Sequence, residues 1–192
     1  MSFLPNRPIA RGVALAVFVA LAGCAPGRDL PPLPPAQAAT EYRLGPGDAV
    51  RLITFGEEPL TGEFRVADGG TIALPLVGAV RAAGLTPHEL ERAVADALRR
   101  GAVLRNPSVS AEVIAYRPIF VLGEVNRPGQ YPYQPGMTVV TAVAVAGGFT
   151  YRAVEDYASV LRTTNGTAIE GKAPRQAFVQ PGDVVTVFER RF

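Results

Sequence analysis

The sequence predicts an α+β fold, with a small sheet-and-helix unit followed by a β-grasp-like unit. Three observations support this class. From Tyr42 onward, short β-rich runs alternate with Gly and Pro turns, and the chain holds 20 Gly and 18 Pro. One strongly patterned helix lies at residues 87–100, and a second group of strands around one short helix begins after Pro118. Such mixed runs are typical of α+β domains rather than of alternating α/β folds.

The first unit, residues 41–117, is predicted to be mainly strands. The turn Gly45-Pro46-Gly47-Asp48 opens it, because Pro46 presets φ and Gly47 tolerates the positive φ of a type II turn. Asp68-Gly69-Gly70 marks a second turn. The predicted strands are 50–55, 63–66, 71–76, 77–81 and, closing the unit, 108–116.

The helix at residues 87–100 has clear signals at both ends. Thr86 is placed as N-cap, Pro87 occupies the first helical position, and Glu89 completes a capping box. Gly101 ends the helix. One apolar stripe at helical spacing predicts the buried face: Leu90, Ala93, Val94, Ala97 and Leu98.

The second unit, residues 118–192, is predicted as strands around a short buried helix. Valines at 138–146 favour a strand, but Thr138 as N-cap and Gly147-Gly148 as a stop indicate a helix. Strands are expected at 119–122, 131–133, 157–163 and 184–188. Gln180-Pro181-Gly182-Asp183 repeats the opening turn of the first unit, which we interpret as a shared turn-then-strand solution rather than a duplicated site.

The N-terminus reads as a lipoprotein export signal. Arg7 and Arg11 precede the uncharged run 12–22, which is too short for a permanent membrane span and ends in Leu21-Ala22-Gly23-Cys24. This resembles a bacterial lipobox, which predicts a signal peptide at 1–23 and lipid attachment at Cys24. An ordinary secretory signal with an incidental cysteine, or a short buried helix, are the alternatives. Prolines at 26, 31, 32, 34 and 35 predict an extended tether over 24–40.

Charge and cysteine content exclude several classes. Without Arg7 and Arg11, the 19 basic residues fall to 17, which equals the 17 acidic ones. A neutral mature chain lacks the basic footprint of a nucleic-acid binder. The single cysteine excludes an internal disulfide, and no later stretch is long and apolar enough for a membrane helix.

The side-chain inventory does not predict catalysis, a metal site or a cofactor site. His88, the only histidine, lies in the first turn of the predicted helix and reads as a solvated residue. Metal-ligand spacings of Cys and His are absent. The adjacent carboxylates Glu57-Glu58 and Glu155-Asp156 point to opposite faces of an extended chain, so they suit solvated loops better than acid–base pairs. A glycosidase with distant carboxylates stays as a minor alternative.

Sugar contacts and subunit contacts leave weak traces in the sequence. The chain has no tryptophan, and its six tyrosines are as compatible with sheet packing as with sugar platforms. Arginine outnumbers lysine by 18 to 1. The planar guanidinium suits interface pairing with carboxylates. One hypothesis therefore places some of five arginines at subunit contacts, with codon bias as an equal alternative: Arg51, Arg65, Arg117, Arg127 and Arg152.

Several motifs, in order, resemble the outer-membrane polysaccharide export family, which includes the Wza-like capsule exporters. Residues 42–48 (YRLGPGD), 68–78 (DGGTIALPLVG) and 106–109 (NPSV) resemble its polysaccharide-export domain. Residues 121–131, the glycines after Ala146 and the terminal 181–185 (PGDVV) resemble a soluble-ligand-binding β-grasp (SLBB) domain. Each motif alone is weak, but the ordered set behind a lipobox is specific.

The resemblance implies a lipid-anchored protein of the outer membrane that faces the periplasm. Copies would form a homo-oligomeric ring that conducts capsular polysaccharide or exopolysaccharide, handed over by an inner-membrane polysaccharide copolymerase. The chain resembles the short, xanthan-type exporters in two respects. It has one SLBB module, and its sequence stops at Phe192 where larger members continue into an amphipathic helix. That type leaves room for an outer-membrane partner.

Two competing functions stay open at this stage. The chain could be a monomeric periplasmic lipoprotein that binds a small soluble ligand through the β-grasp domain. It could also be an enzyme acting on the polymer, although the inventory above predicts none. Multimer size separates the conduit from the ligand binder, and loss of surface polymer on deletion separates the conduit from the enzyme.

Overall fold

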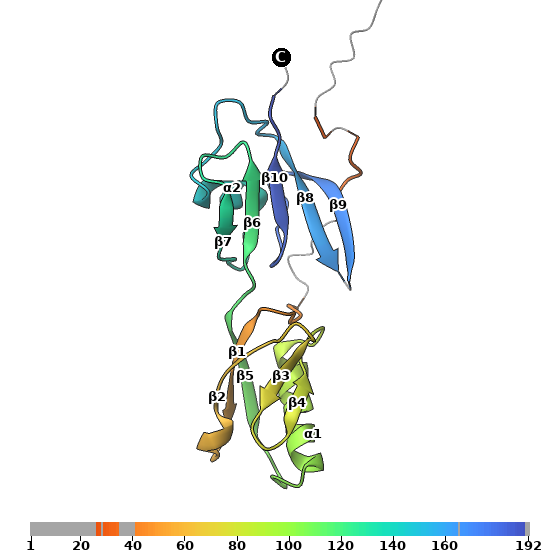
Figure 1. The fold of residues 1–192 in the computed structure, drawn as a ribbon, viewed down its shortest axis with the longest axis vertical. Coiled ribbons are helices and arrows are strands. Elements are labelled where there is room, and N and C mark those ends of the chain that lie inside the picture. The colour runs from red at the N-terminus through yellow and green to blue at the C-terminus, as the bar shows by residue number, and fades with distance from the viewer. Residues whose placement is uncertain (1–25, 28, 35–40, 165, 191–192) are drawn as a thin grey trace, which may run out of the picture.

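The computed structural model describes residues 26, 27, 29–34, 41–164 and 166–190. Two units follow one another along the long axis of the molecule (Figure 1). The N-terminal unit contains the elements β1 to β5, and the C-terminal unit contains β6 to β10. Each unit has its own cluster of buried apolar side chains. Helices and several sheets together confirm the predicted α+β class.

The N-terminal unit combines a three-stranded antiparallel sheet, a separate hairpin and one helix. The sheet has the order β2-β1-β5, and β3 pairs only with β4. The strands on either side of the predicted Asp68-Gly69-Gly70 turn therefore belong to different sheets. The elements are β1 (Ala49–Thr54), a 3₁₀ turn η1 (Glu58–Leu60), β2 (Gly62–Arg65), β3 (Thr71–Leu74), β4 (Gly78–Arg81), α1 (Pro87–Arg100) and β5 (Val109–Ala115).

Helix α1 has the predicted bounds and the predicted cap. The backbone N–H of Glu89 donates to Thr86 Oγ1 at 3.2 Å, and the Thr86 N–H donates to Glu89 Oε2 at 2.9 Å. Its buried side chains Leu90, Val94 and Leu98 pack with β1 in one core, while the two alanines of the predicted stripe are partly buried. The stripe therefore faces the sheet, as its spacing required.

The C-terminal unit is a five-stranded mixed sheet with one short helix. The strand order is β7-β6-β10-β8-β9, and the central pair β6 and β10 is parallel while the other pairs are antiparallel. This order suits the β-grasp-like prediction. The elements are β6 (Ile119–Gly123), β7 (Gly129–Tyr131), α2 (Val139–Val145), β8 (Tyr157–Thr164), β9 (Thr167–Pro174) and β10 (Val184–Val187).

Helix α2 resolves the ambiguity that its valines create. Thr138 accepts from the Thr141 N–H at 3.4 Å, so the predicted N-cap is confirmed. Both Gly147 and Gly148 adopt a φ of +86°, a left-handed conformation that ends a helix readily only at glycine. Val139 and Val143 bury their side chains in the C-terminal core. Tertiary burial therefore overrides the strand preference of valine.

Strand β9 was missed by the sequence analysis. It pairs with β8 along its full length, from Tyr157 opposite Pro174 to Thr164 opposite Thr167. Its own sequence, TAIEGKAP, contains residues that are depleted in strands, so local propensity conceals it. Within the described part of the chain, no helix is long and apolar enough to cross a membrane.

Candidate functional site at the junction of the two units

Two turns of the same sequence pattern lie at the facing ends of the two units. In the first, the Gly45 N–H donates to Asp48 Oδ2 at 2.7 Å; in the second, the Gln180 N–H donates to Asp183 Oδ2, also at 2.7 Å. The N–H of each aspartate returns a bond to the carbonyl three residues earlier. Each carboxylate therefore closes its own Pro-Gly-Asp turn in the same way, as Asx-type turns do.

The aspartate of the C-terminal turn forms a buried ion pair inside its own unit. Arg162 Nε donates to Asp183 Oδ1 at 3.0 Å, and Arg162 Nη2 donates to Asp183 Oδ2 at 2.7 Å. The side chains are 9% and 1% exposed. Arg162 Nη2 also donates to the Phe178 carbonyl at 3.2 Å. The forked geometry satisfies both carboxylate oxygens, which a buried charge requires.

The aspartate of the N-terminal turn is bound by Tyr42 and by Arg117, the last residue before the junction with the C-terminal unit. Its Oδ1 accepts from the Arg117 N–H at 2.8 Å. Its Oδ2 accepts from Tyr42 Oη at 2.5 Å and from Arg117 Nη1 at 3.3 Å. The Asp48 side chain is fully buried, whereas that of Arg117 is 27% exposed. This carboxylate therefore fixes the chain where β5 leaves the N-terminal unit.

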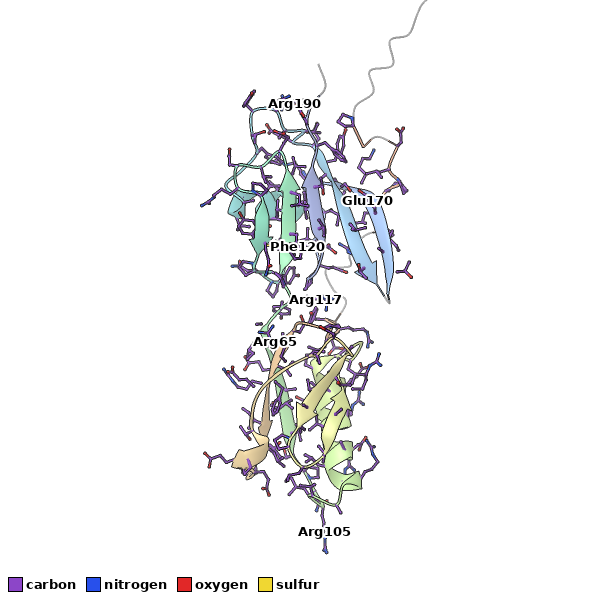
Figure 2. The ribbon with its side chains drawn as sticks, viewed as in Figure 1. Arg65, Arg105, Arg117, Phe120, Glu170 and Arg190 are labelled. Atoms are coloured by element: carbon purple, nitrogen blue, oxygen red, sulfur yellow. The ribbon has the colours of Figure 1, made fainter. Side chains whose placement is uncertain are left out.

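Arg117 connects the two turns. It lies between the units (Figure 2), and its Nε donates to the Pro181 carbonyl of the C-terminal turn at 2.9 Å. Its Nη1 reaches Asp48 of the N-terminal turn. One guanidinium therefore contacts both Pro-Gly-Asp turns, and its rigid donor fork limits how the units can rotate about the junction.

The glycines of both turns make room for that guanidinium. A Cβ added to Gly45 would lie 1.9 Å from Arg117 Nη1, and one added to Gly182 would lie 3.0 Å from Arg117 Nε. Gly182 also has a φ of +88°. Any side chain at these positions would push the guanidinium out of its place between the turns.

Three tyrosines span the same junction beside Arg117. Tyr42 and Tyr116 meet edge to face with centroids 4.9 Å apart, and Tyr116 meets Tyr133 in the same way at 5.5 Å. Burial, and next its hydrogen bond to Asp48, raise the pKa of Tyr42 well above the usual value. Burial also raises the pKa of Tyr133. Both phenols therefore stay neutral at physiological pH, and the three rings add apolar contact across the junction.

The polar groups of the junction bind one another and hold the two units together. Its charged groups pair with one another, and the described residues contain no buried side-chain N or O atom without a partner. No group of three His, Cys, Asp or Glu that could hold a metal occurs in the described part of the chain. The carboxylates of Asp48 and Asp183 therefore act as hydrogen-bond acceptors that hold the two turns.

The residues that the sequence analysis considered for chemistry lie elsewhere, in exposed positions. His88 is 70% exposed and lies 2.8 Å from Glu91 Oε2. Glu58 lies in η1, and Glu155 forms an exposed pair with Arg190 at 3.3 Å. Cys24, the predicted lipidation site, lies outside the described residues.

Four of the five arginines proposed for subunit contacts bind groups of their own chain. Arg117 is engaged inside the chain, and Arg51 and Arg152 form exposed ion pairs with glutamates of the same chain. Arg65 donates to the Gly47 carbonyl at 3.2 Å. A role of these arginines between subunits stays a prediction.

The junction is not apparent from the sequence, although one signal is present. The repeated Pro-Gly-Asp turn is visible there, but the partners of its two aspartates are not. An aspartate at the same position of two buried turns needs a cation, and Arg117 and Arg162 supply it. Which arginines do so depends on contacts 69 and 21 residues apart, which local pattern does not reveal.

Two family models match the chain, one on each side of Arg117. Residues 36–114 match the model described as polysaccharide biosynthesis/export protein. Residues 118–171 match the SLBB domain model. The two matches follow one another in the order that the motifs suggested.

Three curated relatives are similar to parts of the chain. The exopolysaccharide production protein ExoF of Rhizobium meliloti (strain 1021) is 36% identical over 121 residues, covering 57% of this chain and 29% of that protein. The EPS I polysaccharide export outer membrane protein EpsA of Ralstonia nicotianae is 28% identical over 188 residues, covering 79% of this chain and 48% of that protein. The polysialic acid transport protein KpsD of Escherichia coli is 29% identical over 110 residues, covering 56% and 20%. The chain spans less than half the length of each of these relatives.

Proposed function

We propose that this chain, which belongs to the outer-membrane polysaccharide export family, is a component of an export channel for capsular polysaccharide or exopolysaccharide. The observation that carries the proposal is the ordered pair of domains, an export domain followed by an SLBB domain. The names of the relatives support the same class, since they describe exopolysaccharide production, outer-membrane export and polysialic acid transport.

The proposed role is structural and not catalytic. The polar network at the junction consists of ion pairs and hydrogen bonds among residues of the chain itself. A protein that must guide a polymer needs a fixed shape more than a reactive group. The proposed units are residues 41–117 and 118–192, joined where Arg117 meets Pro118.

Attachment to the outer membrane is the second part of the proposal. Removal of the signal peptide 1–23 would expose Cys24 as the acylated N-terminus, and the protein would face the periplasm. The basic residues before a short apolar run, together with the small residues before the only cysteine, support this step.

Self-association into a ring is the third part, and an apolar face of the C-terminal unit supports it. Phe120 on β6, Val184 on β10 and Leu161 on β8 lie side by side in register, so they share one face of the sheet. Phe120 is 38% and Leu161 37% exposed, and Leu122, also on β6, is 42% exposed. An apolar row on the face opposite the core suits packing against a second copy. The ring would receive the polymer from an inner-membrane copolymerase, with an outer-membrane partner completing the route.

The proposal is tested by deleting the gene and quantifying secreted polymer. Loss of secreted polymer, restored by the wild-type chain, is expected. Normal secretion in the deletion strain contradicts an export role. Unchanged amount with altered chain length would instead indicate an enzyme acting on the polymer.

Native mass in mild detergent tests the ring separately. Phe120→Asp with Leu161→Asp should lower the mass to that of a monomer, because a charge on the shared face opposes packing. Phe55→Asp is the matched control, since Phe55 is 84% exposed on the N-terminal unit, away from that face. A wild-type protein that is strictly monomeric at membrane density would favour the alternative of a small-ligand binder.

A further inference from the structure

The proline-rich segment before the N-terminal unit is bound to the C-terminal unit. Its described residues, 26, 27 and 29–34, are called the strap here. Sequence composition predicted an extended tether over 24–40, but the strap begins with a turn, in which the Leu30 N–H donates to the Gly27 carbonyl at 3.4 Å, and then pairs with the sheet. It meets β9, the edge strand of the sheet (Figure 1), at Lys172. A segment that pairs with an edge strand is held in place, whereas a free linker is not.

Two backbone hydrogen bonds join the strap to β9. The Leu33 N–H donates to the Lys172 carbonyl at 2.9 Å, and the Lys172 N–H donates to the Pro31 carbonyl at 2.8 Å. Pro32 between them forms a parallel bridge with Lys172. Proline is tolerated at this position because an outermost strand needs no donor on its open side.

The neighbouring strand is shaped for this contact. A Cβ added to Gly171 would lie 2.7 Å from Leu33 Cα and 2.8 Å from Leu33 N. Gly171 is buried, and Leu33 packs against the C-terminal core. Glycine inside a strand commonly marks the close approach of another backbone. The strap fills that space.

A second contact holds the strap near its beginning. Tyr157 Oη donates to the Pro26 carbonyl at 2.9 Å, and the Gly27 backbone lies against the Phe188 ring, so closely that an added Cβ would be 2.4 Å from it. Lys172 Nζ lies 5.5 Å from the centre of the Tyr157 ring. The strap is therefore bound at both ends, on the edge of β9 and beside Phe188.

The position of Cys24 makes this binding consequential. Cys24 precedes Pro26 by two positions, so the chain between their Cα atoms spans at most about 7 Å. A free proline-rich spacer of residues 24–40 would instead reach about 50 Å. A bound strap leaves almost no slack between a lipid on Cys24 and the folded C-terminal unit.

We propose that the strap holds the Phe188 end of the C-terminal unit against the lipid surface to which Cys24 is attached. This inference rests on the acylation of Cys24 in the proposed function. The Phe188 end of the unit therefore faces the membrane surface, because the proposed lipid on Cys24 is only two residues away from the bound Pro26. Phe188 also lies near the loop that carries Tyr151, since the Val154 N–H donates to the Phe188 carbonyl and the Arg190 N–H to the Arg152 carbonyl. Arg105 is labelled at the opposite end of the molecule (Figure 2).

Hydrogen exchange by NMR tests the strap in the full acylated chain in detergent. The amides of Leu33 and Lys172 should be protected in the wild type. Gly171→Val should abolish both protections while the amides of β8 and β10 stay protected, because a side chain there collides with Leu33. Ala168→Val is the matched control: it enlarges an exposed residue of β9 and should change neither. Leu33→Asn gives a second disruption that leaves β9 unaltered. Free exchange of the Leu33 amide in the wild type overturns the proposal.

Energy transfer to a lipid dye tests the placement on vesicles of phosphatidylethanolamine and phosphatidylglycerol. Cys24 is the only cysteine, so Tyr151→Cys or Arg105→Cys adds one labelling site to the acylated chain. Strong transfer from position 151, little from position 105, and loss of most of the 151 signal with Gly171→Val are expected. Equal transfer from both positions, or no effect of Gly171→Val, overturns the placement.

The outcomes separate this inference from the proposed function. A purified protein whose mass shows no lipid on Cys24 overturns the membrane placement, while the exchange data on the strap stand on their own. Failure of the deletion strain to lose secreted polymer contradicts the export role and leaves both measurements on the strap unaffected.

Discussion

Replacement of Arg117 by alanine is the sharpest test of the junction. The change removes the bond from Nε to the Pro181 carbonyl at 2.9 Å and the contact of Nη1 with Asp48 at 3.3 Å. The backbone N–H of residue 117 and two other donors, Gly45 N–H and Tyr42 Oη, still bind the carboxylate. Asp48 is therefore left weakened but not stripped of partners.

The magnitude follows from what is lost and what remains. Breaking a fully buried ion pair costs about 3–5 kcal/mol. The loss here should be smaller, about 2 kcal/mol, because Arg117 is 27% exposed and Asp48 keeps three donors. For a chain of this length that corresponds to a fall in Tm of about 4–8 °C. Because Arg117 is the residue that contacts both turns, the radius of gyration should also rise.

The assay is scanning calorimetry with small-angle scattering on the same samples. Arg65→Ala is the matched control, since Arg65 donates to the Gly47 carbonyl of the same turn but is exposed and does not reach the other unit. It should change the free energy of unfolding by less than about 0.5 kcal/mol. If Arg117→Ala and Arg65→Ala behave alike in both measurements, the reasoning about the junction is wrong.

Three further substitutions test other parts of the structure. Arg162→Ala leaves Asp183 buried without its cation, so it should lower the free energy of unfolding by about 3–5 kcal/mol in urea titrations. A loss below about 1 kcal/mol would contradict the pairing. Tyr42→Phe should reduce the loss of stability at alkaline pH. Because the pKa of Tyr42 is raised, the folded state keeps the phenol proton while the unfolded chain loses it near pH 10, so the free energy of unfolding falls above that pH by up to about 1.4 kcal/mol per pH unit. An unchanged slope of stability against pH in the variant would refute this. Gly123→Ala should lower the free energy of unfolding by more than about 3 kcal/mol in the same titration. Gly123 has a φ of +81°, and a new Cβ there would lie 2.1 Å from the Val187 carbonyl oxygen. An unchanged free energy of unfolding would mean that β6 and β10 can separate at this point.

Local sequence patterns predicted the helices well. Helix α1 has the predicted bounds because its capping box, proline and apolar stripe all agree. Helix α2 was predicted against the preference of its valines, since Thr138 and the two glycines set its ends. Where the capping residues and the apolar pattern agree, local sequence is enough to predict a helix and its ends.

Features that depend on distant contacts were not predictable in this way. The β9 sequence is poor in strand formers and is held by its ladder to β8, although the Asn165-Gly166 dipeptide before it is a typical hairpin sequence. The junction needs Arg117 to meet turns 69 and 64 residues away. The strap needs Pro31 to meet Lys172. No short stretch of sequence contains both residues of any of these contacts.

The fraction of polymer outside the cell tests the export role most directly. A deletion strain should be complemented with the wild-type chain at native level, and polymer should be measured separately in the periplasm and in the medium. The account predicts that polymer falls outside the cell without the protein and returns with it. An external fraction that is the same with and without the protein would contradict it.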